Sequence, residues 1–145
     1  MERVADFLRE FWILVCGVCS YAFGGLDGLL GALIAFVILD YVTGFSAAIY
    51  NKNLSSAIGF KGILRKAVLF SVVAVAKIVG VDILNVGFIV RDAVIAFYLF
   101  NEGVSILENC KLMDLPVPDA ILNYLKKVKN KFKIDDDNSD TDDKK

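Results

Sequence analysis

Apolar residues along this chain gather in long runs that short polar segments interrupt. Three of these runs carry few charges and cover about residues 29–50, 63–81 and 88–109. At about 1.5 Å per residue, a helix of roughly 20 residues crosses the ~30 Å hydrocarbon layer of a bilayer. The pattern therefore predicts an all-α integral membrane protein with three transmembrane helices, which form a membrane domain over residues 26–110.

Residues 1–25 form a separate apolar segment that begins with charged positions. Its uncharged part, from Phe11 to Phe23, is shorter than a typical span, and Val4, Phe7 and Phe11 fall near one face of a helix. We predict an N-terminal amphipathic helix that is interfacial, re-entrant or a fourth span. Its start is not cleanly positive and no clear small-residue cleavage site follows, so we expect it to be retained.

Beyond the third run the chain becomes polar. Pro116 and Pro118 interrupt helical structure, and Asp119 is placed to cap a new helix. The segment 111–133 is predicted to hold this basic amphipathic helix on the cytoplasmic side. Residues 134–145 form an acidic tail with almost no apolar side chains, and we predict that this tail is disordered.

Basic residues are distributed unevenly around the predicted spans. The loop predicted at 51–62 and its edges carry lysine and arginine but no acidic residue, and short loops of this kind stay in the cytoplasm. This places the 51–62 loop and the C-terminus on the cytoplasmic side. We expect the basic side chains to lie at the membrane surface, against anionic headgroups or simply in water: Lys61, Arg65, Lys66, Lys126, Lys127, Lys129, Lys131 and Lys133. A lysine cluster also fits nucleic-acid binding, but beside three membrane spans we expect no nucleic-acid partner.

Several polar side chains fall inside the predicted spans, where each needs a partner, water or neutralisation. On the third span they are spaced by three, four or seven residues and form one stripe along the helix. The candidates for lining or gating a pore are Asp40, Lys77, Arg91, Tyr98, Glu102, Ser105 and Asn109. The alternative is that these groups form ion pairs that only hold the helices together. For Lys77, the choice is between reaching the outer interface and finding an acidic partner or water.

Small residues spaced four apart occur along the first predicted span. Such pairs let two helices approach closely in lipid, although small residues are also simply common in membrane helices. The helix-packing candidates are Gly28, Gly31, Ala32, Ala35, Gly44 and Ala48.

Composition supports the membrane assignment and removes most enzymatic chemistry. Hydrophobic residues make up 57% of the chain, against roughly 45–50% in soluble domains. Histidine is absent, which removes the usual general base and the commonest metal ligand. Cys16 and Cys19 have no further ligands beside them and are best explained as small buried apolar residues, while Asp40 and Asp92 are weak candidates for an aspartyl hydrolase pair. We expect no catalytic residue, no metal and no cofactor, and therefore no enzyme.

Four segments of the chain resemble a known family. They are LDYVTG (39–44), KNLSSAIGFKGILRK (52–66), FNEGVSILEN (100–109) and LPVPDAIL (115–122), in this order. Together they are similar to the phage-lysis and toxin-secretion holins of clostridia and bacilli, and the resemblance runs from about Asp40 to Lys127. It implies a multi-pass protein of the bacterial cytoplasmic membrane that forms homo-oligomers and opens lesions. Endolysins or large toxins would escape through these lesions without necessarily binding the protein.

Two lines of inference combine into one mechanistic hypothesis. Copies would pack through small-residue faces, neutralise one another's buried charges while closed, and rearrange so that the polar stripe of the third span meets water. The alternatives are a small oligomeric channel or transporter subunit, and an antiholin that holds a partner holin inactive.

Overall fold

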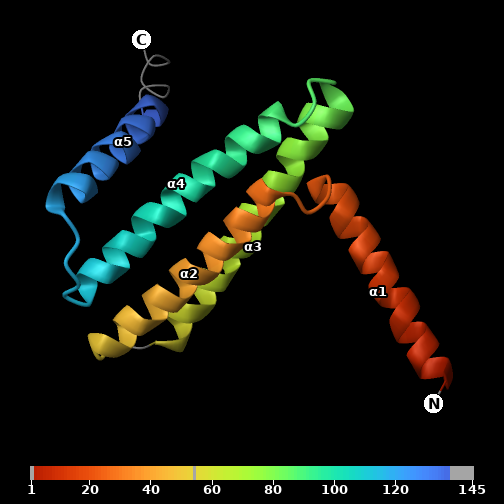
Figure 1. The fold of residues 1–145 in the computed structure, drawn as a ribbon, viewed down its shortest axis with the longest axis horizontal. Coiled ribbons are helices and arrows are strands. Elements are labelled where there is room, and N and C mark those ends of the chain that lie inside the picture. Colours follow the sequence, from red (N-terminus) through yellow and green to blue (C-terminus); the bar gives the residue numbers. More distant parts are fainter. Residues whose placement is uncertain (1, 54, 138–145) are drawn as a thin grey trace, which may run out of the picture.

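The computed structural model describes residues 2–53 and 55–137. In this part of the chain five α-helices and one π-helical segment follow one another, and no strand occurs (Figure 1). The elements are α1 (Glu2–Phe23), α2 (Gly28–Tyr50), α3 (Ser56–Lys77), η1 (Ile78–Ile83), α4 (Ile89–Leu112) and α5 (Asp119–Asp137). The predicted all-α fold is confirmed.

The helices extend beyond the apolar runs that predicted them. α3 begins at Ser56, before the expected start at residue 63, so the predicted 51–62 loop shrinks to residues 51–55. An apolar run marks the part of a helix suited to lipid, whereas lysine and arginine also favour helices and prolong them. α5 extends to Asp137, so the first four residues of the segment predicted to be disordered are helical. Residues 138–145 lie outside the described residues.

Among the described helices, α2 alone is both long enough and apolar enough to cross a membrane by length and composition. The prediction of three such spans is therefore confirmed only in part. α3 contains four basic residues, and α4 contains Arg91, Asp92, Glu102, Glu108 and Lys111, which lower the mean hydropathy of both helices. The lengths of the three helices are similar, so it is these charges that make α3 and α4 less apolar than α2.

α2 and α4 run parallel to each other, and α3 runs in the opposite direction. Asp27 at the start of α2 contacts Arg91 at the start of α4, and at the other end the Asn51 side chain donates a hydrogen bond of 3.0 Å to the Leu112 carbonyl. α2 packs mostly on α4, and α3 packs on α4 more than on α2. α3 is therefore attached to α2 more weakly than α4 is.

A small apolar core joins these three helices in the half that holds the starts of α2 and α4 and the end of α3. Leu33 from α2, Val73 from α3 and Ile95 from α4 are fully buried. The outward faces are apolar as well, with large exposed side chains such as Ile38, Phe45 and Val68. Continuous exposed apolar surface of this kind is rare on soluble monomers and normal on helices that face lipid.

α1 projects away from the other helices and touches them only near its C-terminal end (Figure 1). There Phe23 packs edge-on against Phe70 of α3, with ring centroids 6.2 Å apart. Cys16 and Cys19 are exposed on α1, so the expectation that they are buried is wrong for the single chain. The segment has a helical, amphipathic form as predicted, and apart from its C-terminal end its apolar face and its cysteines are exposed.

Candidate functional site: ionic clusters between the helices

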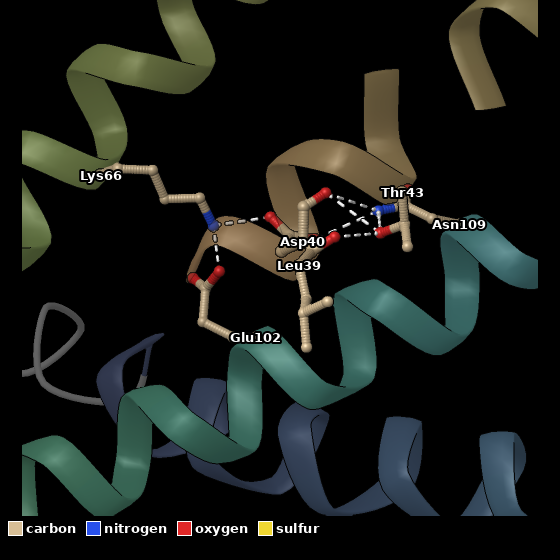
Figure 2. A network of polar contacts seen from close by, with 6 residues as sticks. All are labelled: Leu39, Asp40, Thr43, Lys66, Glu102 and Asn109. Carbon is tan, nitrogen blue, oxygen red and sulfur yellow. Dashed lines mark hydrogen bonds and ion pairs between the residues drawn. The ribbon is translucent and has the colours of Figure 1, made fainter. Parts of the chain in front are cut away.

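The inner cluster joins α2, α3 and α4 through one lysine (Figure 2). The Lys66 ammonium donates a 2.6 Å hydrogen bond to Asp40 Oδ2 and a second bond to Glu102 Oε2. The three side chains are largely shielded, with 16% of Lys66, 12% of Asp40 and 9% of Glu102 exposed. One cation thus bridges two carboxylates, and the three groups carry a formal charge of −1 when all are ionised.

A second layer of polar contacts holds the Asp40 carboxylate in place. Asn109 of α4 donates through its amide nitrogen to Asp40 Oδ1 at 3.1 Å and to Thr43 Oγ1 at 3.1 Å (Figure 2). Thr43 in turn donates to the Leu39 carbonyl one helical turn earlier, at 2.9 Å. Asn109 fits here because Gly44 has no side chain: a Cβ on Gly44 would lie 3.3 Å from the Asn109 amide nitrogen.

The three charged members of the inner cluster lie at one level. Asp40 is ten residues from the end of α2, Lys66 ten from the start of α3 and Glu102 ten from the end of α4. Because these three helix ends lie on the same side, each group is about 15 Å along its helix from that end. A charge at such a depth in lipid is costly unless it is paired, which this arrangement provides.

Two further ionic clusters occupy the opposite end of the helices. Arg91, whose side chain is 1% exposed, contacts Asp27 at 2.6 Å and its neighbour Asp92 at 3.0 Å. Lys77 contacts Asp82 at 3.1 Å and lies over the Tyr21 ring, 4.0 Å from its centroid. Of the two possibilities for Lys77, the structure supports the acidic partner. An apolar core separates these outer clusters from the inner one.

The Asp27 carboxylate precedes α2 and carries a pH-dependent contribution to stability. Its hydrogen bond with Arg91 and the one it accepts from the Leu30 amide lower its pKa from 3.8 to about 2. Because the folded pKa lies below the unfolded one, the contribution is complete above about pH 4 and is lost as the pH falls towards 2. We expect Asp27→Asn to lower the unfolding midpoint in detergent at pH 7, and the difference from the unaltered chain to shrink as the pH falls from 4 through 2. A difference that stays constant with pH would contradict this assignment.

The structure brings together some predicted site residues and separates others. Asp40, Glu102 and Asn109 meet in the inner cluster, whereas Lys77 and Arg91 belong to the opposite end. Tyr98 and Ser105 lie beside Glu102 along a groove of about 310 Å³ between α3 and α4. Whether any of them lines a pore stays a prediction.

Lys66 was expected at the membrane surface, and this prediction is wrong. Its side chain turns between the helices, because α3 starts earlier than predicted and places Lys66 level with Asp40 and Glu102. The sequence contained one indication of this arrangement, since two carboxylates inside predicted spans require a nearby cation. The partners Asp27 and Asp82 were missed because they lie in or beside connections, outside the predicted spans.

The other predicted sets have mixed outcomes within the single chain. Gly44 packs against α4, whereas a Cβ on Gly28 or Gly31 would meet nothing within 4 Å, so contacts between copies stay a prediction for those positions.

Among the basic residues predicted at the membrane surface, Lys126 pairs with Glu108 of α4 at 3.4 Å. Lys61, Arg65 and Lys127 are exposed, and their place at a membrane surface stays a prediction. The side chains of Lys129, Lys131 and Lys133 lie outside the described part.

A larger groove of about 970 Å³ opens beside the inner cluster, between α2 and α3 and over part of α4. Its walls carry apolar and aromatic side chains, and Asp40 and Lys66 line it together with Ser105 and Asn109. In the described residues no group of histidine, cysteine, aspartate and glutamate side chains could hold a metal ion. The polar groups of the site form ion pairs and hydrogen bonds between the helices.

An all-helical body with an apolar exterior and paired charges between its helices defines this chain as a membrane protein. The model of the bacteriophage holin family matches residues 17–130, and the chain belongs to that family. It is 33% identical over 131 residues to an uncharacterized 14.9 kDa protein in the nagH 3' region of Clostridium perfringens, covering 90% of this chain and 99% of that protein. It is 40% identical over 121 residues to the uncharacterized Lmo0128 of Listeria monocytogenes, covering 83% and 86%, respectively. No solved structure matches the chain.

Proposed function

We propose that this protein is a holin, which oligomerises in the bacterial cytoplasmic membrane and opens lesions. Through these lesions an endolysin, or a large toxin without a signal peptide, leaves the cell. The observation that carries the proposal, together with the family, is the inner cluster: a single lysine ties α3 to α2 and α4 at the depth where lipid penalises unpaired charge.

The proposed topology follows from the alternating direction of the helices. α2 and α4 run towards the cytoplasm and α3 runs away from it, so that the 51–55 connection and α5 are cytoplasmic. All three helices then span the membrane, and α5 lies along the inner surface through its basic side. The outer clusters around Arg91 and Lys77 lie near the opposite interface, where water screens part of their charge.

In the closed state each buried charge is paired within its own chain. The sequence-based hypothesis puts the neutralising partners in neighbouring copies, whereas Asp40 and Glu102 pair with Lys66 of the same molecule. Opening therefore requires α3 to move so that Lys66 separates from the carboxylates of Asp40 and Glu102. Oligomerisation favours this step when several copies turn Glu102, Tyr98 and Ser105 towards a shared aqueous space.

Expression of the chain without any endolysin tests the proposal. A holin is expected to collapse the membrane potential abruptly and stop growth, and added endolysin should then lyse the cells. The measurement combines a potential-sensitive dye with passage of a co-expressed folded reporter enzyme to the outside. Ion conductance without reporter release and without cell death would instead indicate a selective channel. No collapse, combined with delayed lysis by a second holin, would indicate an antiholin.

A further inference from the structure

The large groove beside the inner cluster has the shape and charge of a binding site. It follows α2 from Asp40 to Ala48 and α3 from Gly59 to Lys66, which is about 12 Å along the helix axes. Its walls include the side chains of Tyr41, Phe45 and Phe60, all largely exposed. Most of the lining surface is apolar, so an occupant must be apolar along most of its length.

Two cations at the rim of this groove have no partner within the described residues. Lys61 and Arg65 are exposed, line the groove, and form no ion pair there. They are four residues apart on α3 and therefore lie on one side of the helix, about 6 Å apart along its axis. The acidic group in the groove, Asp40, is already engaged by Lys66 and Asn109. The rim thus presents two free positive charges above an apolar wall.

We propose that this groove binds an anionic glycerophospholipid of the inner leaflet. Its phosphate lies between Lys61 and Arg65, and one acyl chain follows the apolar wall between α2 and α3 towards the inner cluster. The topology proposed above puts Lys61 and Arg65 in the cytoplasmic half of α3, about 8 and 14 Å from its first residue. Side chains on a helix tilt towards its N-terminus, here the cytoplasmic end, so both long side chains extend their charges towards the inner headgroups. The inference rests on that topology but does not depend on lesion formation.

A second copy of the chain is the other possible occupant, and charge favours the lipid. α1 is the helix that the fold leaves unpartnered, and it would be the segment to insert. It carries Glu2, Asp6 and Glu10 together with Arg3 and Arg9, so acidic and basic groups nearly balance and little net charge is left to match the rim. An anionic lipid supplies both the charge and the apolar chain that the groove requires.

Filling the groove without changing its charge gives the most direct test. A Cβ on Gly62 would meet nothing within 4 Å, and Gly62 lines the groove, so Gly62→Leu fills it while favouring the helix. The matched control is Ala67→Leu, because Ala67 lies exposed on the same helix but outside the groove. The full-length chain is purified from bacterial membranes in mild detergent, and bound phosphatidylglycerol is counted by native mass spectrometry.

The unaltered chain and Ala67→Leu are expected to retain phosphatidylglycerol, and Gly62→Leu to lose it. Lys61→Gln combined with Arg65→Gln should lower the preference for phosphatidylglycerol over phosphatidylethanolamine by roughly thirtyfold, from the attraction that each basic residue adds. Equal retention by Gly62→Leu, or equal retention of the two lipids by the unaltered chain, would overturn the proposal. So would loss of oligomers in Gly62→Leu with lipid retained, which would assign the groove to a second copy. Normal lipid retention without lesion formation would refute the holin function alone.

Discussion

Replacing Lys66 by methionine is expected to destabilise the folded chain by about 3–5 kcal/mol, the range for removing one partner of a buried ion pair. The substitution leaves Asp40 and Glu102 facing each other between α2 and α4 without the cation that separates them. Methionine keeps the length and apolar stem of the side chain, so the loss reports on the ammonium group. Thermal or denaturant unfolding of the purified chain in detergent measures the effect.

Lys127→Met serves as the control, because Lys127 is also helical, is exposed, has no ion pair among the described residues and lies outside the groove. Its effect should be within about 0.5 kcal/mol, as for ordinary surface positions. Combining Lys66→Met with Asp40→Asn and Glu102→Gln should recover much of the stability, since no buried charge then remains unpaired. If Lys66→Met and Lys127→Met behave alike, Lys66 does not hold the helices together.

Replacing Glu102 by leucine is expected to leave insertion and protein level unchanged and to abolish lysis or delay it several-fold. The remaining Lys66 and Asp40 form a neutral pair, so the closed arrangement of α2, α3 and α4 survives. In the proposed open state, however, Glu102 must be hydrated, and a leucine side chain at that position cannot form hydrogen bonds with water. Lysis timing after induction, with membrane levels followed by immunoblotting, measures the effect.

Glu108→Leu is the control for this experiment, because Glu108 lies on the same helix but pairs with Lys126 of α5 near the helix end. It removes the same charge while leaving the inner cluster untouched, and lysis should keep its normal time. A normal lysis time for Glu102→Leu at unchanged protein level would argue against Glu102 in a water-filled lesion. A delay of equal size in both variants would point to the net charge of α4 instead of the site.

The helices could be predicted from the sequence because the signals that define them, apolar runs and prolines, are local. An apolar run has to become a helix in lipid, since no water satisfies its backbone groups there, and Pro116 and Pro118 separate α4 from α5. The alternating direction of α2, α3 and α4 then follows from short connections between them. Helix limits were less predictable, because the basic first half of α3 is helical although it carries little of the apolar signal.

The sequence by itself determined that Asp40 and Glu102 need neutralisation, because a carboxylate at that depth is costly wherever its partner lies. It could not determine the partner. That choice depends on the rotation and register of α3 against α2 and α4, which the packing of Leu33, Val73 and Ile95 sets. The tertiary structure therefore decided that Lys66 turns inward while Arg65, its neighbour in the chain, faces out. Adjacent residues differ by about 100° around a helix, so the rotation of α3 about its axis decides which of these two cations is buried and which is exposed.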